Sequence, residues 1–236
     1  MRTGALLQAR LNQFPAVTVS FNLNDGYSLE QLRSSVRNQV RKGEKSCSVR
    51  RVAVEELAEA GGALNQMTCR RQHRHDPKED AAYWARLCRA VADTPAAVVW
   101  GAFHNDRLAA YLIALETPTA VEFIMHNSDT ALLPLCPNNI LVYRATRWYL
   151  AERTPPLPVC YGLGSLEDTA SLEHFKTEMG YLLEPIKQRI YFRRRIAWLI
   201  NPYSLAVARR LTGWWFPESY FFRKSLGLMQ RYLSQH

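Results

Sequence analysis

The chain has 236 residues and an apolar fraction of 47%, which suffices for one large domain with a hydrophobic core. Its five cysteines are scattered without a CxxC pair, and no apolar run approaches roughly 18 residues. The composition therefore excludes a disulfide framework, a zinc knuckle and a conventional membrane span. The net charge is +9, and residues 187–236 carry the whole excess, with ten Lys or Arg against one acid, Glu218. This asymmetry indicates an anionic partner for the C-terminal part: a membrane surface, a nucleic acid or a phosphorylated substrate.

The first half of the chain predicts alternating strands and helices. Ser28 and Gln31 have the spacing of a capping box at a helix start, and Gly43 is placed to end that helix. Residues 1–16 carry no signal-peptide pattern, and we expect them to form a helical lead-in. The expected elements are, in chain order, a strand over 16–23, a helix over 28–45, a strand over 46–54, and helices over 54–73 and 79–92.

The second half begins with two apolar strands joined by His104-Asn105-Asp106, a polar turn of hairpin length. Pro137 and Asn138 mark the start of a later helix. The expected elements are strands over 96–103, 107–116 and 119–126, a helix over 137–153, a strand over 159–164, a helix over 171–180 and a strand over 186–195.

This order is typical of a mixed α/β domain over residues 1–195, in which a central mixed sheet is flanked by helices on both faces. Residues 196–236 are predicted to form a basic, aromatic and helical extension. The scattered cysteines suit a reducing compartment, so we expect a cytoplasmic protein, either free or held at the inner face of the membrane.

One short predicted helix carries a lysine in an unusual position. In the stretch SLEHFKTEMGY, Leu172, Phe175 and Met179 fall on one stripe, and Lys176 shares that stripe. One interpretation is snorkelling, in which the stem packs and the ammonium reaches water. The other interpretation is a charge that is placed inside a cleft.

Three stretches carry a family resemblance: LRSSVRNQVRKGEKSCSV, PNNILVYRATRWYLAER and YGLGSLEDTASLEHFKTEMGY. Together they resemble the Fem-like branch of the GNAT acyltransferase superfamily, over roughly residues 17–195. That branch includes aminoacyl-tRNA-dependent peptidyltransferases of cell-wall synthesis and related single-domain acyltransferases. The resemblance implies a GNAT fold and transfer of an acyl or aminoacyl group to an amine. The acceptor would be an envelope precursor, a lipid, a polysaccharide or a secondary metabolite.

The resemblance also implies roles for single residues. Lys176 corresponds to the lysine thought to stabilise the charged intermediate of acyl transfer, and Phe175 to the neighbour that shapes the pocket. Asn139 and Tyr143 correspond to residues that face the cleft from their helix. For Lys176 elementary chemistry agrees, because an amine that attacks an ester or thioester creates an oxyanion, which a fixed cation stabilises.

Further residues are expected to contact the substrates. Arg37 and Arg41 share one face of the basic helix and would bind phosphates, although a solvated helix face is the alternative. Gly164 permits close approach of a ligand to the backbone. The usual GNAT pyrophosphate pattern, Arg/Gln-x-x-Gly-x-Gly/Ala, is replaced by NSDTALLPLCPNN. The donor therefore stays open between acyl-CoA, acyl carrier protein and aminoacyl-tRNA.

Other polar residues are also candidates. Glu122 and His126 lie four apart on one predicted strand and hence on one face, either as a general base with its partner or as polar neighbours at a sheet edge. Asp129 is an alternative base. In RRQHRHD a polar loop is favoured over a metal site, because no further ligand is in view, and we expect no metal. Arg70 and Arg71 in this segment are candidates for contact with an anionic substrate.

The extension over 196–236 mixes aromatic residues with arginines. Such a composition suits an anionic membrane surface, where rings lie at headgroup level and cations meet lipid phosphates. It also suits single-stranded nucleic acid, including parts of tRNA, and it suits simple covering of the core. A rival function follows, in which the chain is a non-catalytic GNAT-fold module that docks on a membrane or on RNA.

Overall fold

The computed structural model describes residues 16–24, 26–72, 81–163, 170–187, 189–215 and 220–234. Residues 1–15, which cover nearly all of the expected lead-in, lie outside these ranges. The chain divides into two compact units. The sheet unit comprises Ser20–Gly162 and Ser171–Leu183, and the C-terminal unit comprises Met1–Val19, Leu163–Ala170 and Glu184–His236.

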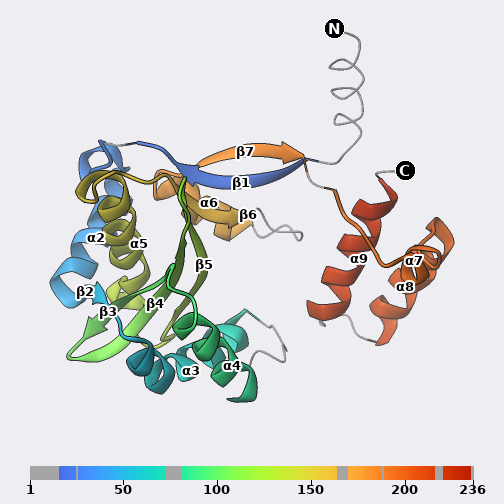
Figure 1. The fold of residues 1–236 in the computed structure, drawn as a ribbon, viewed down its shortest axis with the longest axis horizontal. Coiled ribbons are helices and arrows are strands. Elements are labelled where there is room, and N and C mark those ends of the chain that lie inside the picture. The colour runs from blue at the N-terminus through green and yellow to red at the C-terminus, as the bar shows by residue number, and fades with distance from the viewer. Residues whose placement is uncertain are drawn as a thin grey trace, which may run out of the picture. The chain divides into compact units, whose positions relative to one another are not determined.

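Seven strands of the described residues form one sheet in the order β2-β3-β4-β5-β6-β1-β7 (Figure 1). Strands β2 to β5 pair antiparallel, whereas β5 and β6 pair in parallel, so the sheet is mixed, as predicted. The strands are β1 (Ala16–Asn22), β2 (Ser48–Arg51), β3 (Ala97–His104), β4 (Arg107–Glu116), β5 (Val121–Ser128), β6 (Val159–Leu163) and β7 (Leu182–Lys187).

The hairpin of β3 and β4 agrees closely with the sequence. Its turn consists of Asn105 and Asp106, which both have positive φ, 48° and 61°. Two such residues make the turn whose twist matches that of the flanking strands, and Asn and Asp tolerate this conformation better than most side chains. His104, expected in the turn, is instead the last residue of β3, and its Nδ1 lies 2.7 Å from the carbonyl oxygen of Ser46.

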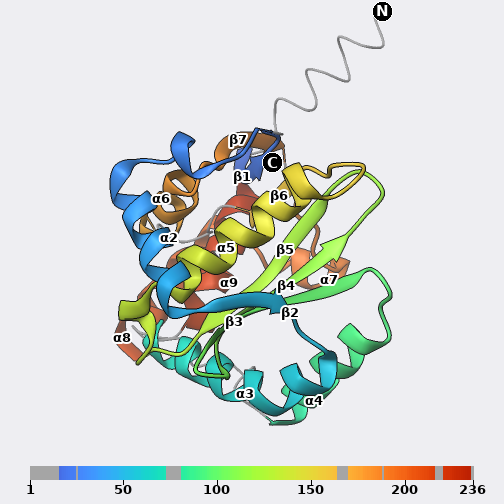
Figure 2. The same cartoon turned by 90° about the vertical axis from the view of Figure 1, so that its left-hand side faces the viewer.

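Helices cover both faces of the sheet, as predicted. On one face α2 lies beside α5, and the core between them and the sheet includes Val40, Leu112 and Ile140 (Figure 2). On the other face α3 and α4 pack over Tyr111 and Ile113, because consecutive residues of β4 point to opposite sides. These helices are α2 (Ser34–Ser46), α3 (Val54–Arg71), α4 (Ala81–Ala92) and α5 (Pro137–Arg147).

The start of α2 differs from the prediction. Ser28 precedes only a short 3-10 turn, Leu29–Gln31, and makes no capping hydrogen bond with its side chain. The backbone is then extended at Leu32, whose side chain is buried in the core, and α2 begins at Ser34. Burial of Leu32 therefore overrides the local capping signal.

Gly43 lies inside α2 rather than at its end. A Cβ on this residue would lie 2.7 Å from the carbonyl oxygen of Cys136 and 2.8 Å from the Cβ of Ile140. Glycine is therefore needed here for the close approach of α2 to α5, and not for a helix terminus.

The last strand is displaced from its predicted position over 186–195. β7 ends at Lys187, and Arg194 already begins α7 (Arg194–Ala197). Phe192, from the alternating stretch, contacts Tyr232 with ring centroids 5.2 Å apart. Phe192 of this alternating stretch thus packs within the C-terminal unit and does not belong to a strand.

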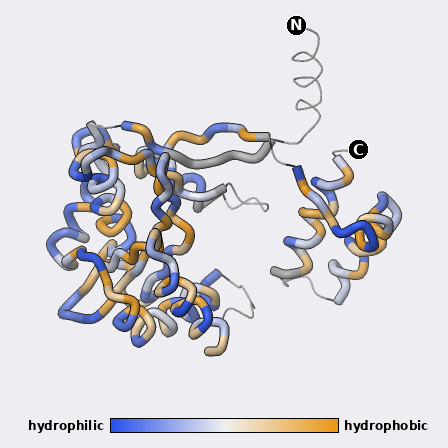
Figure 3. Tube along the Cα trace, viewed as in Figure 1, coloured by the Kyte–Doolittle hydropathy of each residue, from blue (hydrophilic) through white to orange (hydrophobic). Residues whose placement is uncertain are grey.

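The described part of the C-terminal unit that follows β7 contains helices, as expected for the extension. After α7 come α8 (Pro202–Trp215) and α9 (Tyr220–Leu233), which pack against each other. Hydrophobic and hydrophilic residues alternate along these helices (Figure 3). Within the described ranges, no helix is both long enough and apolar enough to cross a bilayer.

Candidate active site

A bulge in β5 lies beside a cavity of the sheet unit. Phe123 and Met125 pair with consecutive residues of β4, which leaves Ile124 as the extra residue. Bulges of this kind bend a strand and re-aim its side chains. The cavity has a volume of about 450 Å³ and is lined by this part of β5 together with residues of β6, α3, α5 and α6 (Ala170–Glu178).

Lys176 lines this cavity from α6 and is only 3% exposed. Its Nζ lies 5.2 Å from the centroid of the Tyr161 ring, within range of cation–π attraction. Burial lowers the pKa of Lys176, while Cys160 and Glu173 act in the opposite direction. Of the two interpretations of this lysine, the structure agrees with a charge inside a cleft and not with snorkelling. Phe175 lines the same cavity.

His126 lines the cavity from β5, and its Nδ1 lies 2.5 Å from the hydroxyl of Tyr161. Part of the ring is accessible, but Nε2 is buried beside Asn138, and neither Nε2 nor the Oδ1 of Asn138 has a hydrogen-bond partner among the described residues. Burial lowers the pKa of His126 to about 4, an effect that Asn138 opposes and Arg71 reinforces. At neutral pH the imidazole is therefore uncharged, with one ring nitrogen able to accept a proton.

Arg71 is a second cation of the cavity and lies in the last turn of α3. Its guanidinium donates to the Oγ1 of Thr130 at 3.1 Å and to the Oγ of Ser128 at 3.4 Å, and burial lowers its pKa. None of the described residues that line the cavity is Asp or Glu. With Lys176, the described part of the wall carries only positive charge, which suits an anionic group or a developing oxyanion.

The predicted pairing of Glu122 with His126 on one face is wrong. Glu122 lies opposite Leu115 of β4, whereas His126 lies opposite Leu112, and positions three apart on a strand face opposite sides. The bulge at Ile124 changes the alternation between the two residues. Glu122 is exposed and is not among the residues that line the cavity.

Asp129, the alternative base, holds the loop that follows β5. Its carboxylate forms an ion pair with Arg107 and accepts a hydrogen bond from the backbone amide of Ala131 at 2.8 Å. The amides of Leu132 and Leu135 likewise donate to carbonyl oxygens inside this loop. The segment in the place of a pyrophosphate loop is thus closed on itself by its own hydrogen bonds.

The two α5 residues expected to face the cleft lie elsewhere. Asn139 donates to the Oε1 of Gln39 at 2.9 Å on the surface between α5 and α2. Tyr143 is 2% exposed and packs against Tyr27, with ring centroids 5.6 Å apart. Asn138 lines the cavity instead. A shift of one residue turns a side chain by about 100° around a helix, which explains this miss.

The basic helix also contributes nothing to the cavity. Arg37 donates to the carbonyl oxygens of Leu32 at 2.8 Å and Glu30 at 3.3 Å, and so ties down the turn before α2. Arg41 is exposed, and neither arginine is among the lining residues. Gly164, expected near a ligand, lies outside the described residues.

The structure does not test the metal site that was weighed in RRQHRHD. His73, His75 and Asp76, weighed as ligands, lie outside the described residues. Among the residues that the structure describes, no group of three or more His, Cys, Asp or Glu is placed to hold a metal. Burial raises the pKa of the Cys160 thiol, which keeps it protonated and a poor nucleophile.

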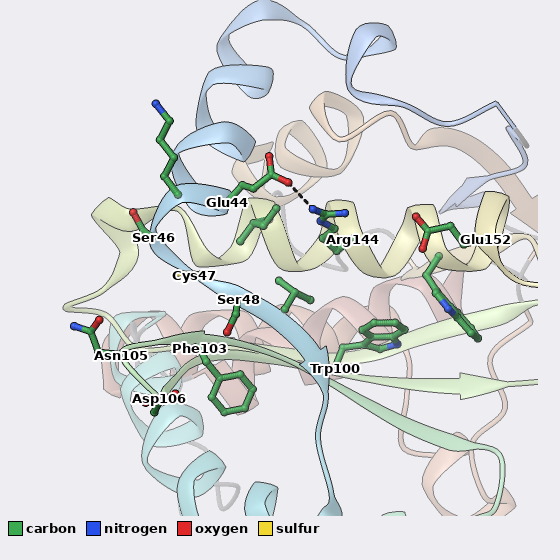
Figure 4. A pocket seen from close by; sticks show the side chains of 14 residues that line it. Glu44, Ser46, Cys47, Ser48, Trp100, Phe103, Asn105, Asp106, Arg144 and Glu152 are labelled. Carbon is green, nitrogen blue, oxygen red and sulfur yellow. Dashed lines mark hydrogen bonds and ion pairs between the residues drawn. The ribbon is translucent and has the colours of Figure 1, made fainter.

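A second cavity, of about 640 Å³, lies in the sheet unit between α2, α5 and the strands β2 and β3 (Figure 4). Trp100, Phe103 and Trp148 line it, and Glu44 forms an ion pair with Arg144 at its wall. Its charged side chains are exposed or half-buried. The cavity at Lys176, which holds a buried charge, is therefore the better candidate for catalysis.

The cavity thus brings together four predicted residues, Arg71, His126, Phe175 and Lys176. It adds Tyr161 and Asn138, which sequence reasoning missed. Tyr161 stands in the motif YGLG, directly before Gly162, whose φ of +66° turns the chain at the end of β6. A tyrosine directly before a glycine with positive φ at a strand end is the signal that could have identified it.

A family model for the acetyltransferase (GNAT) domain matches residues 30–156, which is more than half of the chain. The chain belongs to the GNAT acetyltransferase family. The fold is similar to that of FemX, with a TM-score of 0.58 and 12% identity over 71% of this chain and 59% of FemX. It is also similar to a conserved protein of unknown function from Bacteroides thetaiotaomicron, with a TM-score of 0.56 and 11% identity over 78% of this chain and 65% of that one. No curated protein matches the chain.

Membership of the GNAT family, whose model describes an acetyltransferase domain, confirms the expected fold. The likeness to FemX agrees with the Fem-like branch at the level of the fold. This GNAT protein spans about three fifths of the length of FemX.

Proposed function

We propose that this GNAT protein transfers an activated acyl or aminoacyl group to an amine in the cavity that Lys176 lines. One observation carries the proposal: a lysine that is 3% exposed lines a cavity of a GNAT fold, and the described wall of this cavity holds a second cation and no acid. A cation at the wall of a cavity can stabilise a negative charge that develops there during the reaction.

The proposed step is an addition followed by an elimination. The amine nitrogen of the acceptor forms a bond to the carbonyl carbon of the donor, and the π electrons of the carbonyl move to its oxygen. Lys176 donates a hydrogen bond to this oxyanion, an interaction that typically lowers a barrier by about 3 kcal/mol. The intermediate then collapses, the bond from carbon to the carrier breaks, and a thiolate or a tRNA hydroxyl leaves.

The proton of the attacking amine needs a route to the leaving group. His126 is neutral at pH 7, and its Nδ1 lies 2.5 Å from the Tyr161 hydroxyl, so this pair can take up the proton and pass it on. An imidazole of low pKa holds a proton only briefly, which favours its return to the leaving group. Phe175 shapes the apolar wall beside Lys176.

The proposed donors are an acyl-CoA, an acyl carrier protein or an aminoacyl-tRNA. The proposed acceptors are amines of envelope precursors, lipids, polysaccharides or secondary metabolites. The described wall of the cavity contains Arg71 and no Asp or Glu. Arg71 therefore favours a donor or acceptor that has a carboxylate or phosphate near the reacting carbonyl.

A thermal-shift panel on the full-length chain tests this proposal and separates the donors. The panel contains acetyl-CoA, a long-chain acyl-CoA, acyl carrier protein and an aminoacyl-tRNA mixture. A true donor at about 100 times its Kd stabilises the fold by about 2.7 kcal/mol and raises Tm accordingly. The donor found is then used in labelled transfer to a panel of amines. If no donor raises Tm and no amine is acylated, the rival function as a non-catalytic module replaces the proposal.

A further inference from the structure

The helix α8 is tied to α9 along one side. Arg209 donates to the Oε1 of Gln230 at 2.6 Å, and Thr212 is 8% exposed. Phe192, ahead of α7, contacts Tyr232 of α9. The C-terminal unit therefore has its own internal packing, and one side of α8 is already occupied.

The other side of α8 is an exposed apolar stripe. Tyr203, Val207, Leu211 and Trp214 recur every three or four residues, so they share one face, and Trp215 widens it. Their exposed fractions are high: 85% for Tyr203, 58% for Val207, 55% for Leu211, 76% for Trp214 and 71% for Trp215. We call this set the α8 stripe. Contiguous exposed apolar side chains of this kind mark an interaction surface.

Cations accompany the α8 stripe. The Cζ of Arg210 lies 5.6 Å from the centroid of the Trp214 ring, so a guanidinium lies beside the stripe. In the preceding helix Arg194 is exposed, and Trp198, which follows that helix, is 84% exposed. Residues 187–236 contain ten Lys or Arg and one acid. An apolar face in cationic surroundings is complementary to an anionic lipid surface.

We propose that α8 lies flat on an anionic bilayer, with the α8 stripe in the headgroup region and the neighbouring basic residues against lipid phosphates. This proposal is independent of the proposed acyl transfer, because it needs no substrate. Val207 and Leu211 favour a bilayer over single-stranded nucleic acid, since aliphatic side chains offer bases no stacking surface. The positive excess disfavours a second copy of the chain as the occupant, because like charges repel.

Co-sedimentation of the full chain with vesicles tests the proposal. One set of vesicles is pure phosphatidylcholine, and the other contains about one third phosphatidylglycerol. We expect binding to the anionic vesicles, weaker binding to the neutral ones, and a fall in binding when salt is raised from about 0.1 M to 0.5 M. The double variant Val207→Asp and Leu211→Asp should bind anionic vesicles at least about tenfold more weakly, because it puts two charges into the inserted face.

The control is Leu23→Asp, which places one such charge at an apolar residue of the sheet unit that is 60% exposed. It should bind vesicles as the wild type does, and all variants should keep the wild-type Tm. Three results overturn the proposal. The first is no binding of the wild type to anionic vesicles, and the second is equal binding by the wild type and the double variant. The third is a fall in Tm or a change of oligomeric state in the double variant when neither protein binds vesicles. The last result would mean that protein covers the α8 stripe.

Discussion

Tyr161 contacts both groups that the proposed reaction uses. Its ring lies under the Nζ of Lys176, and its hydroxyl lies 2.5 Å from the Nδ1 of His126. Tyr161→Phe keeps the ring and removes only the hydroxyl, so Lys176 keeps its packing while His126 loses its partner. We expect kcat to fall at least about tenfold with KM little changed, measured by transfer from the donor that the thermal-shift panel identifies. An unchanged kcat would contradict the proton route.

Glu122→Gln is the matched control for that route. The residue was a candidate base from sequence, yet it lies on the opposite face of β5 from His126 and outside the cavity wall. We expect transfer within about twofold of the wild type, because removal of an exposed charge away from the site changes little. A loss as large as that of Tyr161→Phe would return Glu122 to the mechanism.

The lowered pKa of His126 also predicts how the free energy of unfolding depends on pH. Its pKa is about 4 in the folded chain, lowered from 6.5 by burial, so below pH 6.5 the unfolded chain binds a proton that the folded chain does not. Stability should therefore fall as the pH drops from 6.5 to about 4, by up to roughly 1.4 kcal/mol per pH unit. Urea unfolding of the wild type and of His126→Gln at several pH values measures this contribution. Parallel curves for the two proteins would rule it out.

At the scale of elements, Gly43 sets the distance between α2 and α5. In Gly43→Ala the new Cβ would meet Cys136 and Ile140, so the helices must move apart, at a cost of about 1–3 kcal/mol in urea unfolding. Gly213→Ala in α8 is the control, because its Cβ would meet nothing within 4 Å and should add about 0.5–1 kcal/mol of helix stability. Similar effects of the two substitutions would contradict the close-approach explanation.

Elements with local determinants were predicted well. The hairpin turn at Asn105 and Asp106 and the start of α5 at Pro137 depend on backbone preferences that single residues impose. The start of α2 and the place of β7 were not predicted, because burial of Leu32 and the contact of Phe192 with Tyr232 are tertiary effects.

The candidate site was predicted only in part for the same reason. The apolar stripe predicted that Lys176 shares a face with Phe175 and Met179. In the structure Lys176 and Met179 are buried, and Lys176 lines the cavity together with Phe175. The bulge at Ile124 leaves no recognisable mark in the sequence, so the separation of Glu122 from His126 could not be foreseen. On α5, the choice between Asn138 and Asn139 depends on how the helix is rotated against the sheet.

At the scale of the whole molecule, the positive charges discussed above form two groups with different proposed roles. The excess of basic residues in 187–236 belongs to the C-terminal unit and its proposed lipid surface. The buried Lys176 and the half-buried Arg71 belong to the cavity of the sheet unit. Salt should therefore weaken vesicle binding much more than transfer, since buried charges are screened less than exposed ones.

The most direct test of the account is transfer by Lys176→Met, with Lys45→Ala as a control at an exposed lysine. Methionine keeps a stem of similar length and removes the cost of burying an ammonium, so Tm should stay equal or rise. If the ammonium stabilises the oxyanion, kcat should fall by about 100- to 1000-fold while the fold stays intact. A folded Lys176→Met protein with the transfer rate of the wild type would contradict the central claim.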